Sequence, residues 1–257
     1  MNQPILILDE NISKISEQDD LYPIVQATPI KINAYTDLRH RKIFISRVYT
    51  TLWFQILFTS SFIGLCNKNR NLQEFMLSPI GINLMYASIF SILLSSCCLF
   101  GYYDKIKVYP YNYLYVSLFT TMMSYSLGIV GVMYNTQSLL LSGLSTTGIF
   151  SGLTLYAVQT KVDYTMYGNI LIISLFGLFF FGILLSFFQI QMLQLVYSVG
   201  GASLFSFYIV YDTQLIMGGS ERKIQYTLDD AAIASVNLYL DIVNVFLFIL
   251  DIMGQRT

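Results

Sequence analysis

Residues 166–187 read MYGNILIISLFGLFFFGILLSF and contain no charged side chain. A helix of about 20 apolar residues is long enough to cross the hydrocarbon core of a bilayer, which is roughly 30 Å thick. The stretch therefore predicts a membrane-spanning helix.

Six further apolar stretches flank this one, and none of the seven contains a lysine or an arginine. The predicted spans are residues 48–66, 80–103, 111–133, 138–158, 166–187, 192–217 and 231–249. Composition agrees, because a soluble domain of 257 residues with only 11% charged side chains would leave its surface poorly covered. We predict an all-α membrane protein, a seven-helix transmembrane bundle. The seventh stretch is the most polar, and a re-entrant helix is the alternative there.

The first 47 residues are polar and lack the apolar core of a signal peptide. We predict a flexible cytosolic N-terminal tail over residues 1–47, followed by a transmembrane domain over residues 48–257.

The basic residues predict the orientation of the bundle, because lysine and arginine are retained on the cytosolic side of a membrane. With alternate connecting segments assigned to opposite sides, nine basic residues share the side of the N-terminus: Arg39, Arg41, Lys42, Arg47, Lys105, Lys107, Lys161, Arg222 and Lys223. Three fall on the other side: Lys68, Arg70 and Arg256. We therefore expect a cytosolic N-terminus.

Charge and composition also argue against some classes of function. A net charge of −1 disfavours a nucleic-acid partner, which normally requires a basic patch. The single histidine, His40, lies outside the predicted spans, so no histidine-ligated metal site is expected within the membrane. We expect no cofactor and no enzymatic activity.

Two acidic residues, Asp212 and Asp241, lie well inside the predicted spans. A charged side chain within the bilayer costs about 2.5 kcal/mol or more, so such residues usually mark an ion or proton path. Counted from the loop between the last two spans, their depths are roughly 9 and 15 Å at a rise of 1.5 Å per residue. Because the two spans are antiparallel neighbours, we expect the carboxyl groups to lie close together.

Polar residues surround both aspartates. Asn237, Asp241 and Asn244 recur at positions i, i+4 and i+7 and therefore share one helical face, which must face protein or water. Tyr208 lies one turn before Asp212. Two close carboxyl groups cannot both ionise cheaply, so we expect them to share a proton, to repel when it is lost, and then to offer oxygen ligands suited to calcium.

Two other interpretations of the aspartates remain. In one, they are protonated and only bond neighbouring helices together. In the other, they belong to an aspartyl intramembrane protease, but the sequence before Asp241 is Leu238-Tyr239-Leu240, without the glycine that opens the helix in such enzymes.

Several motifs resemble those of one known family. Residues 211–219 (YDTQLIMGG) and 231–254 (AAIASVNLYLDIVNVFLFILDIMG) resemble the C-terminal signature of the Bax inhibitor family, and most closely its lifeguard and Golgi anti-apoptotic branch. Residues 44–59 (FISRVYTTLWFQILFT), 107–120 (KVYPYNYLYVSLFT) and 155–165 (LYAVQTKVDYT) resemble other segments of the same branch, in the same order.

The resemblance implies a fold in which other helices surround a central one. It also implies a pH-sensitive calcium leak channel in the membrane of the Golgi or endoplasmic reticulum, which lowers stored calcium and inhibits apoptosis. Asp212 and Asp241 match the family's proton-sensing pair. The implied partners are membrane lipid and calcium ions. The alternative is a non-conducting membrane protein that regulates cell death by binding death regulators or calcium-release channels.

One departure from the family concerns the basic partner of the aspartate pair. Some relatives have an arginine at the end of the second helix, where this sequence has Lys105 and Lys107. Lysine lacks the bidentate fork of arginine, and Asp104 is close enough in sequence to neutralise either lysine. Which residue, if any, replaces the arginine stays open.

Overall fold

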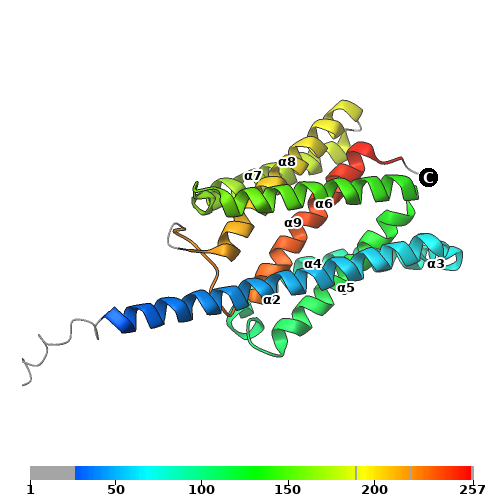
Figure 1. The fold of residues 1–257 in the computed structure, drawn as a ribbon. Helices are drawn as coiled ribbons and strands as arrows, with labels where there is room; N and C mark the ends of the chain where they lie inside the picture. Colours follow the sequence, from blue (N-terminus) through cyan, green and yellow to red (C-terminus); the bar gives the residue numbers. More distant parts are fainter. Residues whose placement is uncertain (1–26, 189, 220–221, 256–257) are drawn as a thin grey trace, which may run out of the picture. The chain divides into compact units, whose positions relative to one another are not determined.

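The computed structural model describes residues 27–188, 190–219 and 222–255, and this part of the chain consists of helices joined by loops (Figure 1). Its elements are α2 (Ala27–Lys68), α3 (Arg70–Leu77), α4 (Pro79–Ile106), α5 (Tyr111–Val132), α6 (Thr136–Gln159), the 3₁₀ helix η1 (Tyr164–Tyr167), α7 (Gly168–Phe187), α8 (Gln191–Met217) and α9 (Ala231–Met253). Seven of them are long and apolar enough to cross a membrane, which confirms the predicted class.

Six of the seven predicted spans agree closely with the helices, but the first helix begins earlier than the sequence indicated. Its membrane-compatible part starts at Leu38 and the helix itself at Ala27, whereas the apolar stretch starts at residue 48. Hydropathy detects only the apolar part of a helix. Residues 38–47 contain no proline or glycine that would interrupt a helix, so the helix extends toward the N-terminus beyond the apolar stretch. Residues 1–26 of the predicted tail lie outside the described part of the chain.

The chain divides into two units, residues 1–43 and residues 44–257. Of the first unit, the structure describes the helical segment from residue 27 to residue 43. The second unit contains the rest of α2, all the other elements and the candidate site.

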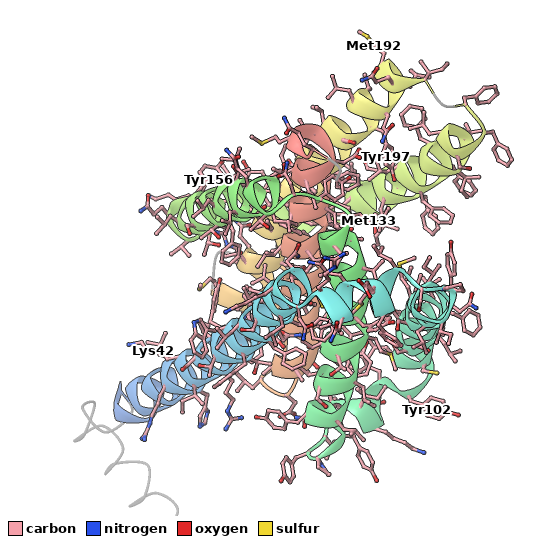
Figure 2. The ribbon with its side chains drawn as sticks, turned by 90° about the vertical axis from the view of Figure 1, so that its right-hand side faces the viewer. Lys42, Tyr102, Met133, Tyr156, Met192 and Tyr197 are labelled. Carbon is pink, nitrogen blue, oxygen red and sulfur yellow. The ribbon has the colours of Figure 1, made fainter. Side chains whose placement is uncertain are left out.

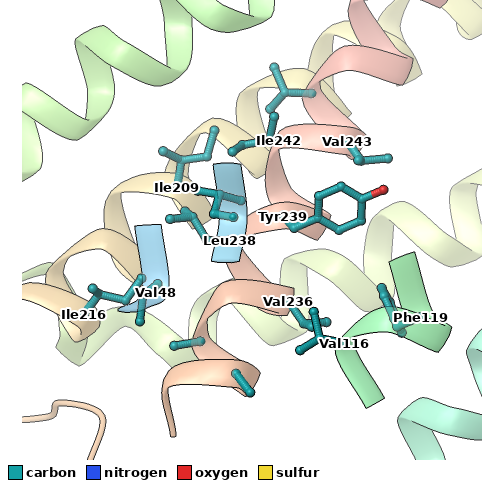
Figure 3. Close-up of a cluster of buried hydrophobic side chains, with 14 of the residues drawn as sticks. Val48, Val116, Phe119, Ile209, Ile216, Val236, Leu238, Tyr239, Ile242 and Val243 are labelled. Atoms are coloured by element: carbon teal, nitrogen blue, oxygen red, sulfur yellow. The ribbon is translucent and has the colours of Figure 1, made fainter. Parts of the chain in front are cut away.

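Helix α9 is central in the second unit. It packs against α5, α6 and α8, and 67% of the apolar window of its span is buried, whereas none of that of α4 is. Figure 3 shows Leu238 and Tyr239 of α9 in a cluster that also holds Val48 of α2 and Phe119 of α5. At 23 residues, α9 is about 34 Å long. That length favours a full span over the re-entrant alternative.

The outer helices present large apolar side chains to their surroundings. Met192 of α8 and Tyr102 of α4, both labelled in Figure 2, are 75% and 58% exposed. Extensive exposed apolar surface is unfavourable in water but not in lipid. The surface therefore agrees with the membrane assignment.

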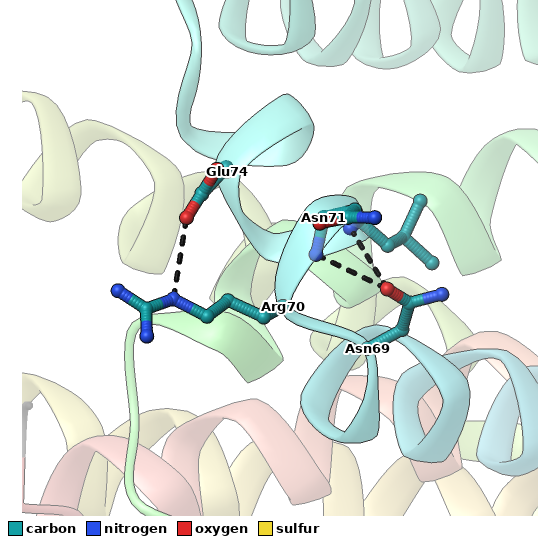
Figure 4. Close-up of polar contacts among 5 residues, drawn as sticks. Asn69, Arg70, Asn71 and Glu74 are labelled. Atoms are coloured by element: carbon teal, nitrogen blue, oxygen red, sulfur yellow. Dashed lines mark hydrogen bonds and ion pairs between the residues drawn. The ribbon is translucent and has the colours of Figure 1, made fainter.

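A short amphipathic helix, α3, connects α2 to α4, and hydropathy did not reveal it. Asn69 caps it, since the Asn69 Oδ1 atom accepts hydrogen bonds from the backbone N–H groups of Asn71 (3.1 Å) and Leu72 (3.4 Å) (Figure 4). Buried Met76 holds α3 against Cys66 of α2. The ion pair between Arg70 and Glu74 (3.3 Å) is exposed and contributes little to stability.

Candidate functional site

The packing of α8 against α9 brings Asp212 and Asp241 together. Each side chain is only 5% exposed, and the two carboxyl groups lie within hydrogen-bonding reach of each other. A carboxyl group donates a hydrogen bond only when protonated, so one proton shared between the two would link α8 to α9. Two ionised carboxylates at this distance would repel instead.

Two buried oxygen atoms at this site have no hydrogen-bond partner within the described segments: Oδ2 of Asp241 and the hydroxyl of Tyr208. Tyr208 precedes Asp212 by one turn of α8 and lies within the electrostatic influence of both aspartates. Buried polar atoms are nearly always satisfied, and an unsatisfied one marks a place for a proton, a water molecule or an ion.

Tyr226, in the loop between α8 and α9, also belongs to this site, and sequence reasoning missed it. Its hydroxyl accepts a hydrogen bond from Nδ2 of Asn237 (2.8 Å), and its backbone N–H donates to the carbonyl of Leu215 (3.1 Å). Burial, and then the nearby Asp212 carboxyl, raise the pKa of Tyr226 well above its ordinary value, so the phenol stays neutral. A tyrosine in a polar loop gave no signal in the sequence.

The two asparagines of the predicted polar face have different contacts. Asn237 joins the site through Tyr226, whereas Nδ2 of Asn244 donates to the carbonyl of Leu240 in its own helix (2.8 Å). Both side chains are half-buried. Asn244 therefore satisfies part of its own hydrogen-bonding capacity locally.

Neither lysine proposed as a basic partner is paired with the aspartates. Nζ of Lys107 lies 2.7 Å from Oδ1 of Asp104 and 5.7 Å from the centroid of the Tyr103 ring, while Lys105 lies over the ring of Tyr102. The hydrogen bond with Asp104 raises the pKa of Lys107. Asp104 therefore neutralises the charge of Lys107 locally.

The loop between α8 and α9 is held by contacts among its own residues and by Tyr103 of α4. Helix α8 ends at Gly218 (φ 58°) and Gly219 (φ 115°), in a region of backbone space that favours glycine. Before α9, Oδ2 of Asp230 accepts from the Thr227 N–H (3.0 Å), and Oδ1 accepts from the Tyr103 hydroxyl (2.6 Å). The loop therefore fixes where α8 ends and where α9 starts.

A second set of contacts, also missed from the sequence, fixes the end of α8 to the connection between α6 and η1. Gln214 is fully buried; its Nε2 donates to the carbonyl of Val162 (3.0 Å) and its Oε1 accepts from the Tyr164 N–H (2.7 Å). Nη2 of Arg222 donates to the carbonyl of Thr160 (2.8 Å). Except for Arg222, these residues lie in the quoted motifs 155–165 and 211–219.

Asp163, in the same connection, gives a first testable prediction. Hydrogen bonds from the Thr165 hydroxyl, and also from the N–H groups of Lys223 and Thr165, hold the pKa of this carboxyl below its ordinary value. Its contribution to stability is therefore present above the unfolded pKa of about 3.9 and is lost as the pH falls through the lower folded pKa. Asp163→Asn should lower the free energy of unfolding at pH 7 by about 0.5–1 kcal/mol, a small value because the group is largely solvated.

The measurement is thermal unfolding of the purified chain in detergent at pH 7 and pH 3. Asp229→Asn, which removes an exposed carboxylate of the α8–α9 loop, should leave the melting temperature unchanged. An Asp163→Asn deficit of equal size at both pH values would contradict the prediction.

The membrane-spanning segments contain a third acidic residue besides Asp212 and Asp241, and it lies in α9. The helix continues to Met253, beyond the predicted end at residue 249, and so includes Asp251. Its carboxylate accepts hydrogen bonds from the hydroxyl of Ser198 and from Nε2 of Gln194 (3.2 Å), both on α8. The expected end followed the apolar run, whereas the helix continues to Met253, just before Gly254, and the carboxylate of Asp251 is satisfied by α8.

Comparisons with known proteins agree on one family. The family model described as inhibitor of apoptosis-promoting Bax1 matches residues 41–257. Protein lifeguard 3 of Homo sapiens is 27% identical over 228 residues, which cover 86% of this chain and 71% of that protein. Protein lifeguard 4 of Mus musculus is 30% identical over 213 residues, which cover 83% of this chain and 85% of that protein. The segment matched by the family model includes the aspartate pair and the α8–α9 loop.

Proposed function

The chain belongs to the Bax inhibitor family, and we propose that it is a pH-sensitive calcium leak channel of endomembranes, gated by Asp212 and Asp241. Family membership suggests a role in the inhibition of apoptosis, and the leak would serve that role by lowering stored calcium. The observation that carries the proposal is the buried carboxyl pair between two membrane-spanning helices, with one oxygen atom lacking a donor.

In the proposed mechanism, the closed state has one proton shared between Asp212 and Asp241, which links α8 to α9. Loss of that proton leaves two carboxylates that repel each other and move the helices apart. Carboxylate oxygens are hard ligands that suit calcium. Acidification therefore closes the path and alkalinisation opens it.

The ligand set suits a calcium ion in transit. A resident calcium ion takes six to eight oxygen ligands, whereas in the part of the chain that the structure describes no group of three or more histidine, cysteine or acidic side chains lies together. Asp212 and Asp241, with the Tyr208 hydroxyl nearby, provide a weaker site. Weak binding lets an ion leave as readily as it enters.

The proposal includes an orientation and a location. The excess of basic residues on one side supports a cytosolic N-terminus, so the α8–α9 loop and the aspartate pair would lie toward the cytosol. The similarity to lifeguard proteins supports an endomembrane, the Golgi or the endoplasmic reticulum.

A second candidate function is that of a non-conducting partner of death regulators or calcium-release channels. It is favoured by α4, which packs against α5 on one side and leaves large apolar side chains such as Phe90 (67%) and Leu93 (61%) exposed. Such a surface suits a helix of another membrane protein as well as lipid.

Calcium flux from liposomes separates the two functions. We expect vesicles containing the purified chain to release trapped calcium at least about tenfold faster at pH 8 than at pH 5, the change that a bias of 1.4 kcal/mol produces. Empty vesicles control for passive leakage. Release no faster than theirs across this pH range would exclude the channel and leave the interaction protein.

A further inference from the structure

A groove of about 400 Å³ lies between α2 and α6, and neither Asp212 nor Asp241 lines it. Residues 56–67 of α2 form one wall, residues 136–147 of α6 form the other, and residues 239–246 of α9 form the floor, together with Leu127 of α5. Its volume is in the range of small-molecule sites, about 300–1,000 Å³.

Most polar side chains along the groove, Thr136 excepted, already have hydrogen-bond partners in the part of the chain that the structure describes. The hydroxyls of Tyr239 and Thr59 lie 2.8 Å apart, the Thr147 hydroxyl donates to the carbonyl of Gly143 (2.8 Å), and Nδ2 of Asn67 donates to the carbonyl of Ile63 (3.1 Å). These groups have little to gain from a polar ligand. What the groove offers is apolar contact surface.

The groove opens toward the bilayer. Both of its walls are membrane-spanning helices, and Leu140 and Leu144, which line it on α6, are 64% and 72% exposed. A void in this position leaves the surrounding side chains without dispersion partners, and the medium that reaches it is hydrocarbon.

The dimensions select one kind of occupant. The wall formed by α2 extends over about 16 Å, at 1.5 Å per residue from Ile56 to Asn67, close to half of a hydrocarbon core of roughly 30 Å. A helix about 10–12 Å across would need far more than the 400 Å³ that the groove offers over this length, whereas a single hydrocarbon chain fits.

We propose that this groove binds one hydrocarbon chain of a membrane lipid. The hydrocarbon chain of the lipid fills the space between α2 and α6 and contacts the face of α9 that carries Tyr239. The site is independent of the aspartate pair and of whether the protein conducts calcium.

Two glycines in α6 provide a matched test. A Cβ atom added at Gly143, which lines the groove, or at Gly148, which does not, meets no atom within 4 Å. Gly143→Leu should therefore fill the groove without displacing the protein, and Gly148→Leu should add the same side chain elsewhere on the same helix. Gly64→Leu fills the groove from α2 and is equally unhindered.

The probe is a phosphatidylcholine with a photoactivatable diazirine in one acyl chain, incorporated with the full chain into phosphatidylcholine vesicles. After irradiation, mass spectrometry of the digested protein maps the labelled residues. We expect residues 56–67 and 136–147 to be labelled more strongly than the exposed surfaces of α4 and α7. Gly143→Leu and Gly64→Leu should each lower that labelling roughly tenfold, the factor that 1.4 kcal/mol of binding energy represents, and Gly148→Leu should not.

Two results would overturn the proposal. They are labelling in the groove no stronger than on α4 and α7, and labelling unchanged in both groove-filling variants that still elute as folded protein. Because the readout is labelling and not flux, it is independent of the calcium assay.

Discussion

Asp212→Asn combined with Asp241→Asn should abolish the rise of calcium release with pH and hold it at the low rate of the unsubstituted protein at pH 5. Two asparagine side chains keep a donor and an acceptor between α8 and α9 at every pH, so the link between the helices persists. They cannot develop the repulsion of two carboxylates, which is about 4 kcal/mol for charges 4 Å apart at an effective dielectric constant of 20. That energy shifts an equilibrium between two states by nearly a thousandfold, which makes this the largest effect expected of any substitution in the chain.

The matched control is Asp251→Asn, the same chemical change in the same helix. Asp251 bonds to Ser198 and Gln194, away from the pair, so its variant should release calcium with the unsubstituted dependence on pH. Retention of that dependence in the double variant would show that the sensor lies elsewhere. Loss of the pH dependence of calcium release in Asp251→Asn alone would show that the sensor is Asp251, near the C-terminal end of α9.

The second large effect is expected from Gln214→Leu, a substitution of similar volume at a fully buried position. It leaves the Tyr164 N–H without its acceptor, because Oε1 of Gln214 is the atom that it bonds. A buried polar group without a partner costs about 1–3 kcal/mol, and the donation to the Val162 carbonyl is lost as well. We expect a loss of about 3 kcal/mol in the free energy of unfolding and a fall in melting temperature of about 5–10 °C.

Thermal unfolding in detergent measures the effect of Gln214→Leu. Gln137→Leu, at an exposed position at the start of α6, makes the same chemical change without a buried partner and should shift the melting temperature by less than about 2 °C. Equal shifts for the two variants would mean that Gln214 does not hold the end of α8.

The spans could be predicted because hydropathy depends on local composition. An apolar run such as residues 166–187 has no stable place except lipid or a core, whatever its neighbours are. The same logic fails for α3, since a helix of eight residues with Met76 as its buried anchor owes its position to α2 and α5. It also set the start of α2 too late, because helix formation extends past the apolar residues.

The aspartate pair could be found from the sequence because a carboxyl group inside a span is exceptional by itself. Tyr226 and Gln214 could not be found in this way. Both residue types are ordinary in loops and helix ends. Only the folded chain shows that Tyr226 lies against the end of α8 and that Gln214, in the last turns of α8, bonds to the connection before η1. For Lys105 and Lys107 the related sequences suggested a place beside the aspartate pair. In the structure both lysines contact other residues instead.

Hydrogen bonds at both ends of α8 limit how that helix can move. Gln214 ties one end to the connection before η1, and Gln194 and Ser198 tie the other end to Asp251. A rod fixed at both ends can bow in the middle but cannot swing outward. Asp212 lies two residues before Gln214, close to one fixed end of α8, where such a rod moves least. Repulsion there therefore produces a narrow opening, and we expect a slow, steady flow of ions in place of the brief, high-conductance openings of a helix that is hinged at one end.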